Sequence, residues 1–311
     1  MKKQLSALCF LVIVTITAIA QEKDFPKLTG SYLGQKPPGM KPEIFAPGVI
    51  PHSTGLALGL NMLDEGTEFY YSQWEQGTIR IRDRKLLYDV WTQDTIAPFS
   101  GKYRDWDLTA APNGQRLYFT SNRPIEKNGV EKSDADIWYV ERKNDSWSEA
   151  KWLGEPVNSD SNEIHPSIAQ NGNLYFFGRF GPNICVAKYE DGHYEEPEKL
   201  GDEINSEYVD IDPFVAPDES FLIFHSNRPG GLGGNDLYIS FRDFENDKWM
   251  KAVNMGAEIN TENSDYCARI STDGKYLFFS RRNLETGEKK FYWIDAKFIE
   301  DLRKEALKND K

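Results

Sequence analysis

The stretch "DIDPFVAPDESFLIFHSNRP", which spans residues 210–229, decides the fold. It contains an apolar-rich segment, the turn residues Pro217 and Asp218, and a second apolar segment at Leu222, Ile223 and Phe224. Proline fits the first central position of a tight turn, and aspartate favours the position after it. The stretch therefore predicts two antiparallel strands joined by a short turn.

The same pattern occurs five times along the chain. The other copies are "DWDLTAAPNGQRLYFTSNRP" from Asp105, "EIHPSIAQNGNLYFFGR" from Glu163, "DYCARISTDGKYLFFSRR" from Asp265 and a fainter "ALGLNMLDEGTEFYYSQ" from Ala57. Their turns are anchored on Gly66, Gly114, Gly172, Glu219 and Gly274, with separations of 48, 58, 47 and 55 residues. Repeats of this length are typical of the blades of a β-propeller.

Each copy continues with a variable loop, a third strand such as Asp236-Leu237-Tyr238, and a fourth segment that carries its own refrain. The refrain appears as "WLGEPVNSD", "LGDEINSEY" and "MGAEINTEN". A blade of four antiparallel strands cannot bury both faces alone, so neighbouring blades must stack around an axis. The sequence therefore predicts an all-β propeller of five four-stranded blades over residues 52–296.

The two ends of the predicted propeller differ from the repeats. The last copy lacks a fourth strand, and "KPEIFAPGVI" (residues 41–50) resembles "EPEKLGDEIN" (196–205), so we expect the N-terminal lead, residues 21–51, to close the ring. Residues 297–311 place Ile299, Leu302, Ala306 and Leu307 on one helical face, which predicts a short amphipathic helix.

The repeats resemble the TolB-like, PD-type relatives of WD repeats. The resemblance is carried best by Pro217-Asp218, Leu222-Ile223-Phe224, Ser226-Asn227-Arg228 and, after a glycine-rich loop, Asp236-Leu237-Tyr238. Such propellers are usually six-bladed, so six blades are the alternative to the five counted here. The resemblance implies an exported binding scaffold, although some relatives are enzymes.

The N-terminus indicates export. Lys2 and Lys3 precede an apolar run, and Ala18-Ile19-Ala20 resembles a cleavage site, so residues 1–20 are expected to be a signal peptide. Cleavage would leave 37 − 2 = 35 basic and 49 acidic residues, a formal charge of −14. This charge excludes nucleic acid as an expected partner. We expect a periplasmic or secreted protein without a transmembrane segment, whose Cys185 and Cys267 lie too far apart for a disulfide.

The glycine-rich stretch "SNRPGGLGGNDLYIS" (226–240) lacks the features of a phosphate-binding loop. No Lys-Ser/Thr pair follows its last glycine, and the next residues predict a strand rather than a helix. We interpret it as a loop between the second and third strands that ends at Asp236. Such loops vary between the copies and are expected to carry specificity.

Candidate site residues lie nine and seven positions before each turn anchor. These offsets give the pairs Asp105 and Asp107, Glu163 and His165, Asp210 and Asp212, and Asp265 and Cys267, but Ala57 and Gly59 in the first copy. Residues two apart on a strand point to one side, so all of them are expected to line the channel mouth. Arg123, Arg228 and Asp236 from the neighbouring loops complete the expected ligand-binding set.

The sequence leaves several roles open for these channel-mouth residues. The acids could cap loops, accept backbone N–H groups or pair with arginines. Alternatively, Glu163, His165, Asp210 and Asp212 could hold a divalent cation such as calcium. We expect a non-enzymatic binding protein for an envelope protein or glycan that uses an acidic, loop-rich channel mouth. The alternative is a metal-assisted carbohydrate-active enzyme, either a glycoside hydrolase or a polysaccharide lyase.

Overall fold

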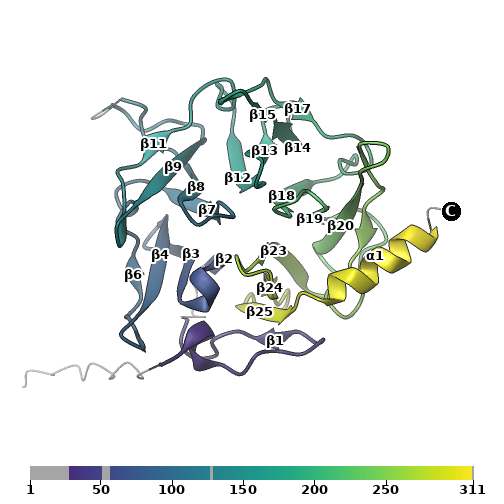
Figure 1. Ribbon diagram of the computed structural model, residues 1–311, viewed down its shortest axis with the longest axis horizontal. Coiled ribbons are helices and arrows are strands. Elements are labelled where there is room, and N and C mark those ends of the chain that lie inside the picture. The colour runs from purple at the N-terminus through teal and green to yellow at the C-terminus, as the bar shows by residue number, and fades with distance from the viewer. Residues whose placement is uncertain (1–27, 51–56, 127–128, 310–311) are drawn as a thin grey trace, which may run out of the picture.

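The computed structural model describes residues 28–50, 57–126 and 129–309, so the expected signal peptide lies outside the described residues. Five antiparallel sheets surround a central axis (Figure 1). The prediction of an all-β propeller is confirmed, and the blade number is five rather than six. Among the described residues, no helix is long and apolar enough to cross a membrane.

The blades follow one another along the chain. Blade 1 comprises β2 (Ala57–Leu63), β3 (Glu68–Glu75), β4 (Thr78–Leu87), β5 (Val90–Trp91) and β6 (Thr95–Ile96). Blade 2 comprises β7 (Asp105–Ala110), β8 (Arg116–Ser121), β9 (Asp136–Lys143), β10 (Ser146–Trp147) and β11 (Lys151–Trp152). Blade 3 comprises β12 (Glu163–Ile168), β13 (Leu174–Gly178), β14 (Asn183–Ala187) and β17 (Glu198–Lys199), with the hairpin β15 (Tyr189–Glu190) and β16 (His193–Tyr194).

Blade 4 comprises β18 (Asp210–Val215), β19 (Phe221–Ser226), β20 (Asp236–Asp243), β21 (Lys248–Trp249) and β22 (Val253–Asn254). Blade 5 comprises β23 (Ser264–Ile270), β24 (Tyr276–Arg282), β25 (Lys289–Asp295) and β1 (Glu43–Ile44). Two short 3-10 helices, η1 (Ser31–Gly34) and η2 (Asp64–Gly66), and one α-helix, α1 (Phe298–Asn309), complete the elements. The innermost strands, β2, β7, β12, β18 and β23, surround the channel (Figure 1).

The N-terminal segment closes the ring, as the sequence predicts. Glu43 and Ile44 of β1 pair with Trp293 and Tyr292 of β25. The fully buried ring of Phe45 follows directly and contacts the rings of Phe69, Phe278 and Trp293. The aromatic contacts connect the first and last blades at the point where the chain would otherwise leave a sheet edge unpaired.

Hydrophobic side chains fill the interfaces between blades. The described residues form five buried clusters, one for each pair of neighbouring blades. Helix α1 extends the cluster between blades 4 and 5 through Phe298, Ile299 and Ala306. Leu302 lies partly buried against the same cluster, whereas Leu307, expected on this face, is exposed.

The repeated refrain fixes the connection between blades. Asn158, Asn205 and Asn260 are buried, and each side-chain amide makes two hydrogen bonds to the backbone of one third-strand residue. For Asn205, the oxygen accepts from the Ile184 N–H at 2.7 Å and the amide donates to the Ile184 carbonyl at 3.0 Å. The asparagines therefore satisfy backbone groups where the chain crosses to the next blade.

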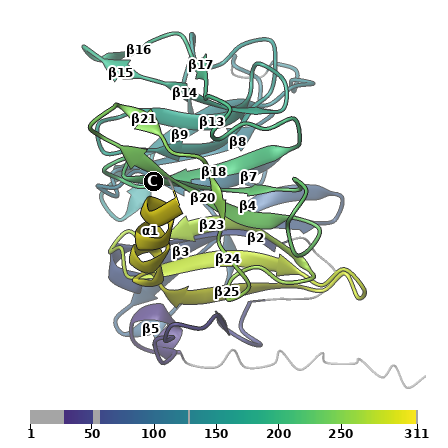
Figure 2. The ribbon, with the colours of Figure 1, turned by 90° about the vertical axis from the view of Figure 1, so that its right-hand side faces the viewer.

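The two faces of the ring carry different connections. The hairpin β15–β16 and the 283–288 loop lie on opposite sides in Figure 2. The tight turns between first and second strands lie on the side of that hairpin, because antiparallel strands reverse direction at each connection. We call this side the turn face. The opposite side, with the loops between second and third strands, is the loop face.

Candidate functional site

A β-bulge occurs at the same position of the innermost strand in every blade. The pairing of first and second strands shifts register at that position in all five blades. The bulged residues adopt left-handed backbone conformations and are Gly59 (φ 58°), Asp107 (φ 50°), His165 (φ 54°), Asp212 (φ 60°) and Cys267 (φ 54°). Because a bulge interrupts side-chain alternation, the two candidate positions of each copy do not share one environment.

The bulged residues meet across blades in a charged cluster. Nδ1 of His165 lies 2.8 Å from Oδ2 of Asp107 and 3.3 Å from Oδ1 of Asp212. Arg269, two residues after the bulge of blade 5, donates to Oδ1 of Asp212 at 2.6 Å. His225 of β19 contributes its Nδ1 at 3.9 Å from Oδ2 of Asp212. We call these five residues the channel cluster.

Burial and neighbouring charges shift the pKa values in this cluster in opposite directions. Although burial alone would lower it, the carboxylates of Asp107 and Asp212 raise the pKa of His165 to about 10. Burial disfavours the carboxylate of Asp212, but Arg269 and His165 hold its pKa well below the usual range. Burial lowers the pKa of His225 to about 4, so its imidazole is neutral at pH 7.

The cluster is therefore close to electrically neutral at pH 7. Protonated His165 and Arg269 balance the carboxylates of Asp107 and Asp212, and His225 adds no charge. These five residues do not form the acidic channel mouth that the sequence predicts. The reason is Arg269, a buried arginine in the innermost strand of blade 5. The repeat pattern does not predict an arginine at this position.

The acids at the start of the innermost strands have a different environment. Asp105, Asp210 and Asp265 are fully buried, and each accepts a hydrogen bond at 2.5 Å from an arginine of its own blade. The partners are Arg123, Arg228 and Arg281, which also donate to the carbonyls of Phe99, Ile204 and Ile259. These ion pairs connect the start of a blade to the segment that precedes it, so they stabilise the fold.

The remaining expected site residues are also held within the fold. Glu163 is fully buried and accepts from the N–H and hydroxyl of Ser159. Asp236 accepts from the N–H groups of Leu232 and Gly233 and from the side chain of Asn254. Through these hydrogen bonds Asp236 fixes the conformation of the glycine-rich loop.

The four residues expected as metal ligands do not converge. His165 and Asp212 lie together in the channel cluster, but Glu163 and Asp210 are each saturated by neighbours at their own blade entry. Within the described part of the chain, no group of three or more His, Cys, Asp or Glu side chains could hold a metal ion. Cys185 and Cys267 are both free and buried.

The loop face presents exposed hydrophobic side chains from every blade. They lie in the loop between the second and third strands or, for Trp74, at the end of the second strand, with exposed fractions of 38% to 89%: Trp74, Ile125, Val130, Phe180, Leu232 and Leu284. The variation between the copies predicts that these loops carry specificity, but the repeat pattern does not predict this shared apolar position. We call these six residues the apolar ring.

The glycine-rich loop holds part of the apolar ring in place. Gly234 donates to the carbonyl of Asn263 at 2.8 Å, which joins the loop of blade 4 to the start of blade 5. A Cβ atom on Gly233 would lie 1.8 Å from that same carbonyl oxygen, so only glycine allows this approach. A Cβ on Gly234 would lie 3.4 Å from Leu284, which shows that the two loops are in contact.

Comparison with solved structures finds weak similarities. It is similar to the structure of a TolB from Acinetobacter baumannii, with 12% identity and a TM-score of 0.45, covering 78% of this chain and 57% of that one. A TolB structure from Agrobacterium tumefaciens has 13% identity, a TM-score of 0.49 and 78% coverage of both chains. A thermostable family-43 glycoside hydrolase has 14% identity and a TM-score of 0.48, covering 77% and 89%.

No protein-family model and no curated protein matches the chain. The chain spans 57% of the length of the Acinetobacter TolB.

Proposed function

We propose that the protein is an exported propeller that binds an envelope protein through its loop face. The observation that carries the proposal is the apolar ring. Each of the five blades contributes at least one exposed hydrophobic side chain in, or directly before, the connection between its second and third strands. Scattered exposed hydrophobic residues are normal, but their recurrence at one connection gathers them on one face. Rigid aromatic and aliphatic side chains are typical anchors of protein interfaces.

Preorganisation of the loops supports the same proposal. The loop of blade 4 is fixed by Asp236 and by its hydrogen bond to the Asn263 carbonyl, so little conformational entropy is lost when a partner binds. The predicted signal peptide at residues 1–20 supports export and a partner in the periplasm or outside the cell.

The channel cluster does not favour the alternative of a carbohydrate-active enzyme. Oδ2 of Asp107 and Oδ1 of Asp212 lie 2.8 and 3.3 Å from one nitrogen of His165, so they are at most 2.8 + 3.3 = 6.1 Å apart. An inverting pair of carboxylates is separated by about 6.5–9.5 Å. In either mechanism the scissile bond must lie between the carboxylates, and here the imidazole occupies that space.

The proposal is tested by comparing two triple variants of the full chain in pull-downs from the native cell envelope. Phe180→Ser, Leu232→Ser and Leu284→Ser remove three side chains of the apolar ring. Leu87→Ser, Tyr88→Ser and Phe244→Ser remove exposed hydrophobic side chains from outside it as a matched control. We expect the first variant to lose the captured proteins and the second to retain them. Equal retention by both variants would reject the loop face as the binding surface.

A further inference from the structure

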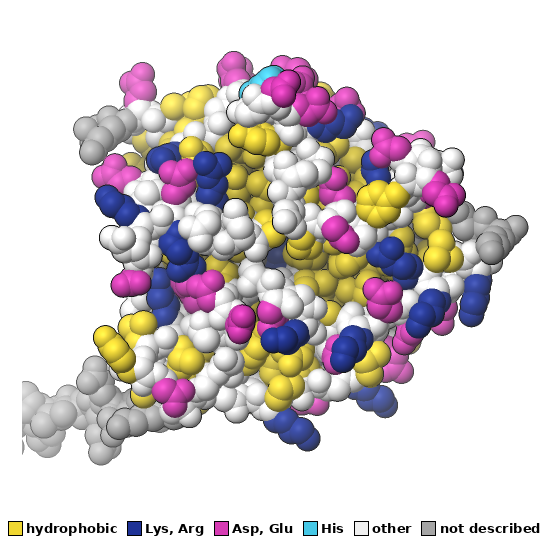
Figure 3. Space-filling model, in the orientation of Figure 1, with side chains coloured by type: hydrophobic (Ala, Val, Ile, Leu, Met, Phe, Trp, Pro, Cys, Tyr) yellow, Lys and Arg dark blue, Asp and Glu magenta, His cyan; other side chains and the backbone are white. Residues whose placement is uncertain are grey.

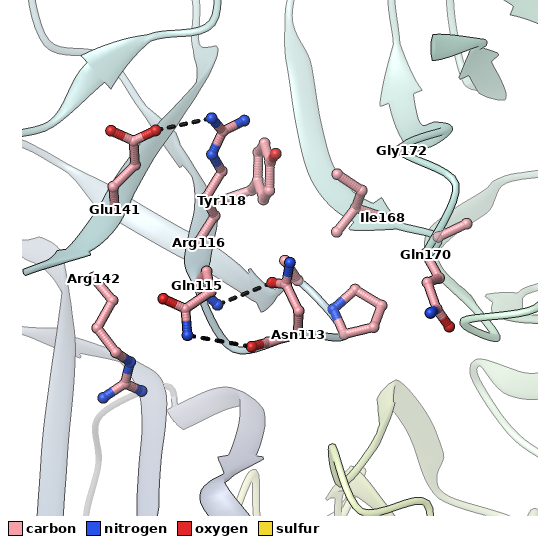
Figure 4. A pocket seen from close by; sticks show the side chains of 12 residues that line it. Asn113, Gln115, Arg116, Tyr118, Glu141, Arg142, Ile168, Gln170 and Gly172 are labelled. Carbon is pink, nitrogen blue, oxygen red and sulfur yellow. Dashed lines mark hydrogen bonds and ion pairs between the residues drawn. The ribbon is translucent and has the colours of Figure 1, made fainter. Parts of the chain in front are cut away.

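The cavity between blades 2 and 3 shown in Figure 4 is held by contacts among its own residues. Arg116 pairs with Glu141 at 2.8 Å, and the side chain of Asn113 accepts from the Gln115 N–H at 3.0 Å. The hydroxyl of Tyr118 interacts with its neighbours as well. These contacts already engage the polar side chains that blade 2 contributes to this cavity.

A cavity at the outer rim of the ring, between blades 4 and 5, has a different character. Its volume is about 300 Å³, at the lower end of the range for small-molecule sites. It is lined by the N-terminal lead, the refrain of blade 4, the end of β25 and helix α1, which lies along this rim in Figure 1. Its large apolar side chains are Met40, Met255, Ile259, Ile294, Phe298 and Leu302.

The charged residues that line this rim cavity are all acidic. Glu258 belongs to the refrain, and Asp301 and Glu305 belong to α1. Asp301 pairs with the exposed Lys304 at 2.8 Å, whereas Glu258 and Glu305 form no ion pair with any described residue. On the turn face, by contrast, basic and acidic side chains are intermingled (Figure 3). The rim cavity therefore favours an occupant that is both apolar and positively charged.

The repeat identifies a backbone acceptor at the same cavity. In the refrains of blades 2 and 3, the carbonyl two residues before the buried asparagine accepts a hydrogen bond from the next blade. The carbonyl of Pro156 accepts from Arg179 at 2.7 Å, and the carbonyl of Glu203 accepts from the Ala252 N–H at 2.9 Å. The equivalent carbonyl in the refrain of blade 4 is that of Glu258, and it accepts no hydrogen bond from any described residue.

The closing strand explains this difference. Val253 of β22 and Glu43 of β1 occupy equivalent positions, because each pairs with the matching residue of its third strand. Ala252, which precedes Val253, donates its N–H to the preceding refrain, but Pro42, which precedes Glu43, has no N–H. The N-terminal lead therefore completes the sheet of blade 5 and leaves the Glu258 carbonyl without a donor from the closing strand.

We propose that the rim cavity docks a basic, apolar peptide segment of a protein partner, independently of the loop face. An apolar side chain of the segment contacts Met40 and Leu302, and a lysine or arginine beside it faces Glu258 and Glu305. A peptide N–H donates to the Glu258 carbonyl. The methionines suit this role, because flexible and polarisable thioethers adapt to different side chains. A peptide supplies all three contacts, whereas an apolar amine supplies only two.

Fluorescence anisotropy with a labelled Lys-Leu-Leu-Lys peptide, blocked at both ends, tests the proposal. Glu-Leu-Leu-Glu and Lys-Ser-Ser-Lys keep only the apolar or only the basic side chains, and both should bind more weakly. Glu258→Lys with Glu305→Lys should weaken binding of Lys-Leu-Leu-Lys about tenfold or more, since attraction becomes repulsion. Glu262→Lys with Glu285→Lys changes two other exposed acids by the same net charge and should bind as the parent does.

Three further measurements locate the peptide and identify it as one. Met40→Ser shortens a side chain that is 47% exposed, so the fold should tolerate it while binding weakens. N-methylation of both leucines removes two N–H donors and should also weaken binding, and octylammonium should bind less tightly than the peptide.

The proposal is overturned if the parent does not bind Lys-Leu-Leu-Lys, if the two charge-reversed variants bind it equally, or if Met40→Ser binds it as the parent does. Octylammonium that binds as tightly as the peptide, or N-methylation without effect, would overturn the assignment of a peptide.

Discussion

Asp212 is the residue on which the channel cluster depends most. Its carboxylate contacts the guanidinium of Arg269 and the imidazole of His165, and all three side chains are largely buried. Burying a charge is costly unless a partner compensates it, so the three groups stabilise the channel only as a set. The left-handed backbone of Asp212 shows that the bulge is maintained although an aspartate is less suited to it than a glycine.

Removing the charge of Asp212 should therefore destabilise the whole propeller. We expect Asp212→Asn to lower the free energy of unfolding by about 3–5 kcal/mol, because it leaves Arg269 and His165 buried without their acid. Denaturant unfolding measures this change. Asp247→Asn breaks the pair with Arg242 at an exposed position and should change stability little. Similar losses in the two variants would show that burial does not decide the effect.

His165 predicts a loss of stability at alkaline pH. Its pKa of about 10 in the folded protein lies above the ordinary value of 6.5, so folding favours the protonated form. The stabilisation is fully present below pH 6.5 and is lost as the pH rises towards 10. Unfolding measured at pH 6, 8 and 10 should show a steeper decline for the parent than for His165→Gln. Parallel declines would mean that His165 is not the titrating group.

At the level of elements, the turns and the repeat could be read from the sequence, whereas the bulges could not. Pro-Asn-Gly and related turns have local chemical causes, so their positions follow from the residues themselves. The bulge at Asp107 and its equivalents depends on pairing with a second strand, and it separated each pair of candidate acids. The contacts among Asp107, His165 and Asp212 join three blades. They depend on how the blades pack, so the sequence of a single strand does not predict them.

The closing strand provides a direct test at this scale. Phe45, which follows β1, is fully buried among aromatic rings of blades 1 and 5. We expect Phe45→Ala to lower the free energy of unfolding by about 3–5 kcal/mol, the usual cost of truncating a buried aromatic side chain. Glu43→Ala, at an exposed position of the same strand, is the control. Thermal unfolding in which both variants match the parent would contradict closure by this segment.

For the whole molecule, the distribution of charge argues that the fold does not depend on calcium. The acids of the channel cluster and of the blade entries are already paired with arginines, a histidine or serine hydroxyls. A cation binding there would have to displace those partners. We therefore expect the melting temperature to be unchanged by calcium or by a chelator. A rise with calcium that Asp212→Asn abolishes would restore the channel as a cation site.

The division between the two faces of the ring is the central claim at this scale. The apolar ring and its fixed loops lie on the loop face, and the tight turns between first and second strands lie on the turn face. A protein partner that binds as proposed should cover the first and leave the second open.

Hydrogen exchange of the complex with its captured envelope partner tests this claim most directly, because it reports which backbone amides the partner covers. We predict slower exchange in residues 179–182, 227–235 and 283–288, and unchanged exchange in the turn-face segments 111–115 and 189–194. Protection confined to the turn-face segments, with the three loops exchanging as in the free protein, would contradict the claim.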